Sequence, residues 1–463
     1  MQKNNLSILR RLGRYKFLLV LTWIYAYSIY LGAVEYLPNQ ISAPGIFTQA
    51  FIEPSEWLLI FAVIIFTTSL IPLRIDRPSS LFAIVIYLFV YLPALVLYAG
   101  RGGSIFNIHE LFLLISMTIG FCIVAKIPRR MGKFRSKAEG CRAFDNNALI
   151  IFSSIISFLL MGYIFANNYQ TMRFAGLDEI YLQRDLGRVD LNKTSGLLLG
   201  YSKTYLSYLF APIIFSYGLW RNALRYKIFG FSIFLFCYAI AAERSIFIYP
   251  YVIYIISAFV KRGGVDVFPF LIKYLTTSSV IIILISIFYE WNYLLEIIGF
   301  LFFTRLIATP GQFVGDYYEY FSDKGYLFWS NFRGLDLLFS PPSHFQGDSL
   351  WPYLGWIVGR DLYGINSNLN ASFWATDGIA AAGPIGLIFI SIVLSIYLYF
   401  LDVSSSFWPR QFVIPLAFPL AFVITNGALL TTFVSYGGLA LIFILLFFRK
   451  TSYIKNKIHL LVV

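Results

Sequence analysis

An arginine between two apolar segments is the residue in this sequence best suited to chemistry. Arg244 follows Glu243 where two apolar runs meet with almost no loop between them. A charged group near the end of a buried helix is costly unless it is paired or lines a wet cavity, so it is a functional candidate by default. A salt bridge to Glu243 is the alternative, although neighbouring side chains on a helix point about 100° apart.

The segment from about 292 to 383 combines arginines with many aromatic residues. Its arginines are Arg305, Arg333 and Arg360, and its aromatic residues include Trp329, Trp351, Trp356, Trp374, Tyr317, Tyr318, Tyr320 and Phe321. Aromatic faces stack on the C–H faces of sugars, and guanidinium forks bind phosphate through paired hydrogen bonds. The alternative is that these rings form the aromatic belt at the membrane–water interface.

Two further candidates lie in polar segments. Arg184 and Arg188 are four residues apart in the segment from about 167 to 197, so on a helix both would lie on one face and could grip one diphosphate. A solvated helix face with alternating charges is the other interpretation. His344 could act as a general base, or it could be a surface histidine without a role.

Several motifs of other enzyme classes are missing. The sequence has no outer Asp-x-Asp pair, no P-loop, no H-E-x-x-H and no G-x-S-x-G, and its three cysteines lie at no metal-ligand or redox spacing. We therefore expect no metal site and no cofactor.

A membrane protein must position these residues. The chain has 463 residues, of which 59% are hydrophobic and 13% charged, and its mean hydropathy is +0.72, whereas soluble domains are about 25% charged. This composition excludes a soluble enzyme and a disordered chain. A net charge of +13 would suggest a nucleic-acid partner in a soluble protein, but in a membrane protein it more often records topology, so we expect no nucleic acid.

The expected fold class is an all-α polytopic membrane protein with about 12 transmembrane helices. A spanning helix needs about 20 largely apolar residues. The apolar runs lie near 17–36, 57–73, 81–99, 111–126, 147–166, 198–220, 228–242, 246–260, 268–291, 384–401, 411–430 and 432–448. We expect residues 1–463 to form a single integral membrane domain.

Charge assigns the two sides of the membrane. With cytoplasmic termini, about two thirds of the lysines and arginines fall on inner segments, as the positive-inside rule requires. Segments 167–197 and 292–383 then become the long outer loops, and the larger one is expected to carry short helices. Residues 294–308 are apolar enough for a re-entrant or interfacial helix, and if they span, the number of spans changes.

Four short segments accompany this topology, at residues 242–245, 304–310, 366–378 and 383–386. Together with the topology, these segments resemble the oligosaccharide repeat unit polymerases, the Wzy-type O-antigen and capsule polymerases of bacteria. The resemblance implies a fold like that of the GT-C glycosyltransferases and a location in the bacterial inner membrane, with the active site facing the periplasm.

The same resemblance implies the substrates and partners. The donor and acceptor would be undecaprenyl-diphosphate-linked oligosaccharides embedded in the lipid bilayer, with a chain-length regulator as a further candidate partner. The growing chain would move as a block onto a new repeat, without a metal ion, in the biosynthesis of lipopolysaccharide O-antigen, capsule or exopolysaccharide.

The site residues follow by matching this chemistry to the sequence. Fixed arginines would stabilise the diphosphate leaving group, and a carboxylate would orient or deprotonate the acceptor hydroxyl. The candidates are Arg244 and Arg305 for the diphosphate, Arg184 or Arg188 and Arg360 as helpers, Asp377, Glu243 and, less favoured, His344 for the acceptor, and Asn368, Asn370 and Trp374 for the sugars. Gly378, Gly383 and Gly386 are expected to allow close helix packing.

Two alternatives remain from the sequence. A lipid-linked oligosaccharide flippase or transporter would place its charges along a central cavity, where Lys203, Arg244 and Glu290 are the deep candidates. An O-antigen ligase would keep a loop histidine in a short motif, and His344 lacks the Asn and Leu expected after it.

Overall fold

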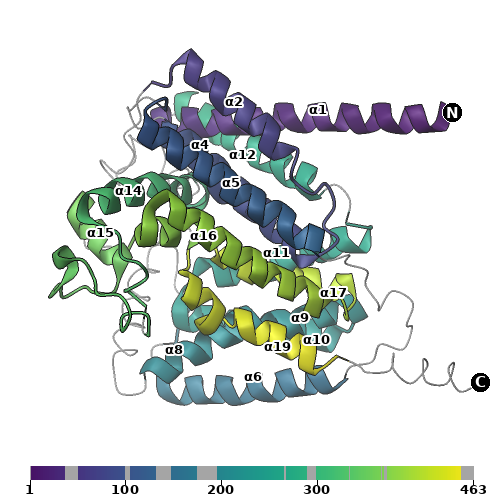
Figure 1. Cartoon of the computed structure of the whole chain (residues 1–463). Helices are drawn as coiled ribbons and strands as arrows, with labels where there is room; N and C mark the ends of the chain where they lie inside the picture. Colours follow the sequence, from purple (N-terminus) through teal and green to yellow (C-terminus); the bar gives the residue numbers. More distant parts are fainter. Residues whose placement is uncertain are drawn as a thin grey trace, which may run out of the picture.

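The computed structural model describes residues 2–36, 51–99, 105–131, 147–170, 172–174, 196–264, 267–288, 299–332, 334–365, 368–369 and 373–449. In this part of the chain all secondary structure longer than a single residue is helical (Figure 1). Arg184, Arg188, Arg333 and Asn370 lie outside the described residues.

The helices follow the expected apolar runs. In the first half of the chain they are α1 (Gln2–Leu31), η1 (Gly32–Tyr36), α2 (Pro54–Thr68), α3 (Pro78–Ile86), η3 (Tyr87–Tyr91), α4 (Leu92–Ala99), α5 (Ile108–Met131), α6 (Asn147–Asn168), α8 (Gly196–Tyr205), η4 (Leu206–Phe210) and α9 (Ala211–Arg221). In the second half they are α10 (Leu224–Ala241), α11 (Arg244–Lys261), α12 (Val267–Phe288), η5 (Phe300–Ala308), α14 (Thr309–Lys324), η6 (Ser343–Phe345), α15 (Leu354–Tyr363), α16 (Phe373–Ser405), α17 (Arg410–Leu416), α18 (Phe418–Val423), η7 (Thr431–Ser435) and α19 (Gly438–Phe447).

Eight helices in the described residues are long and apolar enough to cross a membrane, and shorter apolar helices lie at Pro54–Thr68, Arg410–Val423 and Gly438–Phe447. The central span, Pro78–Ala99, is entirely buried by its neighbours. Peripheral α6 instead exposes large apolar side chains such as Phe158 and Leu159. A soluble protein would not tolerate so many exposed apolar faces, so the structure is that of a multi-pass membrane protein.

Two ends of the helix bundle can be distinguished in Figure 1. The N-terminal end of α1 and the C-terminal end of α19 lie at one end, and α14 and α15 lie at the other. We call these the terminal end and the α14–α15 end. Near the C-terminal end of α16, Asp402 accepts hydrogen bonds from the backbone N–H and the hydroxyl of Ser79, at 3.0 and 2.6 Å. This carboxylate therefore caps the first turn of α3 and ties it to α16.

The sequence suggested a re-entrant, interfacial or spanning helix at residues 294–308, of which the structure describes residues 299–308. These residues form no candidate span. They lead through the π-helix η5 directly into α14. Almost every residue of α14 from Thr309 to Phe321 is buried, with Glu319 as the exception. Gly311 lies against the backbone of Pro93 and Ala94 in α4, where a Cβ atom would come within 2.6 Å. The larger loop thus contributes a packed helix at the α14–α15 end of the bundle.

A kink in α16 anchors this packed region. Ala382 and Gly383 leave the helical conformation, and Pro384 has no N–H to offer the carbonyl of Ala380. The backbone N–H groups of Leu327 and Phe328 donate to the carbonyls of Ala380 and Ala381 instead, both at 2.9 Å. The chain leaving α14 is therefore held by carbonyl groups that the kink sets free.

The kink also brings two glycines together, as the sequence predicted for close packing. A Cβ atom on Gly378 would lie 2.5 Å from the carbonyl oxygen of Gly386, and a Cβ atom on Gly386 would meet the carbonyl oxygen of Gly378. The first turns of α16 therefore fold back against its long apolar part. Gly383 occupies the left-handed region, with φ of 59°.

Candidate functional site

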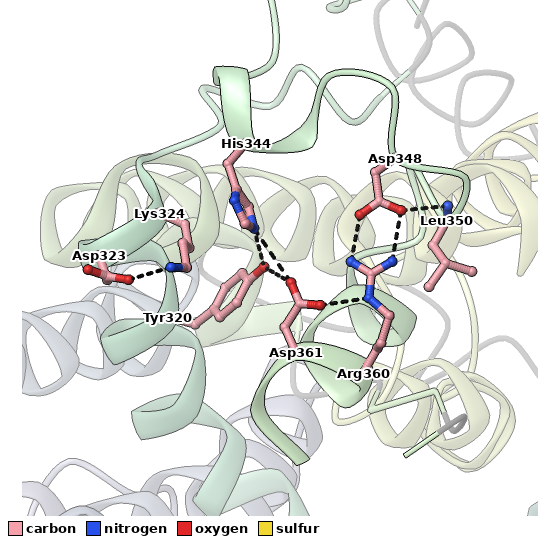
Figure 2. Close-up of polar contacts among 8 residues, drawn as sticks. All are labelled: Tyr320, Asp323, Lys324, His344, Asp348, Leu350, Arg360 and Asp361. Carbon is pink, nitrogen blue, oxygen red and sulfur yellow. Dashed lines mark hydrogen bonds and ion pairs between the residues drawn. The ribbon is translucent and has the colours of Figure 1, made fainter. Parts of the chain in front are cut away.

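A network of charged and aromatic side chains joins α14 to α15 (Figure 2). We call it the α14–α15 cluster, and its members are Tyr320, His344, Asp348, Arg360 and Asp361. Arg360 donates two parallel hydrogen bonds to Asp348, at 3.0 and 2.6 Å, and its Nε donates to Asp361 Oδ1 at 2.6 Å. Two carboxylates thus occupy the fork of Arg360. To bind a phosphate, Arg360 would have to leave Asp348.

The other oxygen of Asp361 faces Tyr320 and His344. The hydroxyl of Tyr320 donates to Asp361 Oδ2 at 2.6 Å, and His344 Nε2 lies 3.3 Å from the same hydroxyl and 3.5 Å from Oδ2. Because the phenolic hydrogen points to Asp361, the phenolic oxygen is left to accept a hydrogen bond from Nε2–H. In a neutral imidazole, this arrangement leaves Nδ1 with a lone pair. In Figure 2 the second ring nitrogen makes none of the contacts drawn.

The cluster shifts the pKa values of its members in a consistent way. The guanidinium of Arg360 holds the pKa of Asp348 below its usual value. Burial acts to raise the pKa of Asp361, but hydrogen bonds from Arg360 and Tyr320 outweigh it, so the pKa of Asp361 also lies below its usual value. Burial, with the hydrogen bond to Asp361, raises the pKa of Tyr320. Near neutral pH, Asp348 and Asp361 are therefore ionised and Tyr320 keeps its proton.

A second set of polar residues also joins α14 to α15. Asp316 is fully buried and accepts hydrogen bonds from Gln312 at 3.3 Å and from the hydroxyl of Tyr363 at 2.8 Å. The Tyr317 hydroxyl donates to the carbonyl of Leu369 at 3.2 Å. The sequence interpretation missed Asp316, Gln312 and Tyr363. A sequence signal for them was present. Residues 312, 316 and 320 follow one another at intervals of four, so they form one polar stripe on the buried face of α14.

The Glu243–Arg244 pair lies at the junction of α10 and α11. Ala242 directly follows α10 in the left-handed conformation, with φ of 49°, and Arg244 begins α11. Lys203 Nζ lies 2.8 Å from a carboxylate oxygen of Glu243, and the hydroxyl of Tyr208 donates to the other at 3.3 Å. Glu243 thus joins the start of α11 to α8 and η4. To act as a base toward the acceptor hydroxyl, Glu243 would first have to break its ion pair with Lys203.

Arg305 lies on η5, which leads directly into α14. Arg305 is exposed, and its guanidinium carbon lies 5.2 Å from the centre of the Phe300 ring. An exposed guanidinium supported by an aromatic ring suits the binding of an anionic group.

The candidates at the start of α16 serve packing first. Trp374 is fully buried and donates its Nε1–H to the hydroxyl of Ser391 at 3.1 Å, so its ring offers no face to a sugar, contrary to expectation. Asp377 accepts the backbone N–H of Leu429, which ties α16 to the turn before η7. Asn368 is half-buried, and its amide oxygen has no hydrogen-bond partner within the described part of the chain.

The candidates therefore lie on several different elements. His344 and Arg360 come together in the α14–α15 cluster, Glu243 and Arg244 start α11, and Arg305 stands on η5. Within the described ranges, no group of three or more His, Cys, Asp or Glu side chains could hold a metal ion. No family model, curated protein or solved structure matches this chain.

Proposed function

We propose that this protein polymerises undecaprenyl-diphosphate-linked oligosaccharide repeats at the outer face of the bacterial inner membrane. The observation that carries the proposal is the α14–α15 cluster, which sets a histidine against a tyrosine–aspartate pair at one end of an apolar helix bundle. An acceptor hydroxyl attacking a sugar–diphosphate bond needs such a base, and the departing diphosphate needs cations.

In the proposed reaction, His344 Nδ1 accepts the proton of the acceptor hydroxyl. The hydroxyl oxygen forms a bond to the anomeric carbon of the growing chain while the bond from that carbon to the diphosphate breaks. Arg244 and Arg305 stabilise the diphosphate charge. Asp361 is a positioning residue, because it acts through Tyr320 and His344.

The proposed topology has twelve crossings and a GT-C-like arrangement, with cytoplasmic termini and the α14–α15 end facing the periplasm. Eight long apolar helices, three shorter ones and the continuous helix from Gly196 through η4 to Arg221 supply the elements for it. A chain-length regulator is a further proposed partner.

Polymer length on a gel tests the role of the arginines. A deletion strain carrying Arg244→Ala or Arg305→Ala should make short chains or single repeats. Arg225→Ala is the matched control, because Arg225 is exposed at the opposite end of α10 from Arg244. A full ladder of repeats from Arg305→Ala would remove Arg305 from the site.

The product of the deletion strain tests the class of protein. A single repeat attached to the surface anchor is the expected result for a polymerase. Complete chains that fail to reach the anchor would indicate a ligase, and repeats trapped inside the cell would indicate a flippase.

A further inference from the structure

An exposed apolar segment follows α14 and has no counterpart in the proposed reaction. It comprises residues 328–332 and 334–339, and we call it the apolar turn. Leu337 and Leu338 are 86% and 72% exposed, and Phe328 and Phe339, whose rings lie 6.2 Å apart, are 52% and 45% exposed. Soluble surfaces rarely collect side chains of this kind in one place.

The apolar turn is continuous with a lipid-facing stripe on α16. The exposed apolar residues of α16 recur at helical spacing: Ile385, Phe389, Ile392, Ile396 and Phe400. Trp329, at the start of the apolar turn, packs its ring 5.0 Å from the ring of Phe389. Phe389 is five residues past Pro384, which is roughly 8 Å along the helix. The apolar turn thus lies beside the first turns of α16 after its kink, within the candidate span Trp374–Ser405.

The backbone of the apolar turn is suited to an environment poor in water. Its N–H groups at Ser330, Phe332, Leu335, Asp336, Leu338 and Phe339 donate to carbonyl groups of residues 327–335, at 2.9–3.1 Å. The N–H of Gly334 donates to the side chain of Asp336 at 2.6 Å. Backbone groups that enter lipid must find partners within the protein, and most of those described here do.

We propose that the apolar turn inserts into the lipid leaflet at the α14–α15 end of the bundle. Its ligand is phospholipid at the boundary between headgroups and acyl chains. Leu337, Leu338 and Phe339 form the inserted tip, and Trp329 and Phe328 join that tip to α16. Because Leu327 and Phe328 are also hydrogen-bonded to the α16 kink, insertion holds the base of α14 at a fixed height above the membrane. This inference does not depend on the proposed function.

Site-directed fluorescence tests the insertion. The full chain is placed in phosphatidylcholine vesicles, and a polarity-sensitive fluorophore is attached to Leu338→Cys or, independently, to Leu337→Cys. Cys237 is fully buried, so only Cys122 and Cys141 need replacement by serine in the background. Ile392→Cys, on the exposed stripe of α16, is the positive control, and Ser343→Cys, exposed in the same loop, is the negative control.

The expected result is a blue-shifted emission that falls by about half or more with nitroxide lipids, since an interfacial segment lies roughly 5–10 Å deep. Ser343→Cys should respond to aqueous iodide instead. Quenching of both tip positions by iodide and not by nitroxide lipids would overturn the proposal. Protection from both quenchers would also overturn it, in favour of a protein partner such as a second copy of this chain.

Discussion

The hydroxyl of Tyr320 donates a 2.6 Å hydrogen bond to Asp361 and thereby joins α14 to α15. The two residues are far apart in the sequence, and the carboxylate also receives Arg360 and faces His344. A buried helix is thus linked to the exposed histidine through one carboxylate. This link determines which substitutions should affect activity and which should affect only stability.

Substitutions at His344 and Asp361 should lower the rate of polymer formation by different amounts. Loss of a general base typically costs about 10²–10⁴-fold, which we expect for His344→Gln. Loss of a group that only orients the base costs less than loss of the base itself, so we expect a smaller fall for Asp361→Asn and Tyr320→Phe. The measurement is the initial rate with purified protein and lipid-linked repeats, with kcat and KM separated.

The matched control is Asp323→Asn. Asp323 also lies on α14 but pairs only with the exposed Lys324 at 2.8 Å among the contacts drawn in Figure 2. Its rate should equal that of the unaltered protein. Equal rates for His344→Gln and Asp323→Asn would exclude His344 as the base.

Acid should loosen the contact between α15 and the loop that carries Asp348. The folded-state pKa values of Asp348 and Asp361 lie below their usual values, so the stability that they add is present above about pH 4 and is lost as the pH falls through the lowered values. The loss should be small, about 1 kcal/mol or less, because Arg360 is 44% exposed. Hydrogen exchange of residues 354–363 from pH 6 downward measures it.

Asp348→Asn provides the comparison for this pH dependence. Its α15 amides should exchange faster at pH 6, and their protection should change less on acidification. An unchanged pH profile would show that the ion pair does not hold α15.

Gly378→Ala should destabilise the protein because the added methyl group meets the backbone of Gly386. Forcing a methyl group into a packed contact costs about 1–3 kcal/mol. Gly162→Ala is the control, because Gly162 lies within α6 with open space around its Cβ position. That substitution should add up to about 1 kcal/mol to the free energy of unfolding. Its melting temperature in detergent should therefore be unchanged or higher. Equal melting temperatures for both variants would contradict the fold-back of α16.

Trp374 should behave as a core residue. Trp374→Ala removes a fully buried ring and should cost about 3–5 kcal/mol. Trp374→Phe keeps most of the volume and loses the hydrogen bond to Ser391, so the hydrogen-bond part of its cost should be about 1 kcal/mol. Thermal unfolding in detergent compares the two. If Trp374→Phe kept its stability but lost its affinity for lipid-linked sugar, the ring would have to be a sugar-binding surface after all.

The sequence by itself determined the class of structure. Runs of about 20 apolar residues can bury their backbone polar groups only as helices in lipid, so the helical elements could be predicted. His344 and Arg360 could also be selected, because a histidine and an arginine in a long aromatic segment are chemically conspicuous. Close packing at Gly378 and Gly386 was predictable from residue size alone.

Only the tertiary structure decided which side chains meet. Asp348, Asp361 and Tyr320 carry no local signal that they share one arginine and one histidine, because their contacts cross α14, η6 and α15. Likewise, Trp374 looked like a sugar-stacking residue until packing against Ser391 placed it in the core. Periodicity in a sequence records which face of one helix is apolar, whereas a site depends on how several helices pack, and no single segment encodes that arrangement.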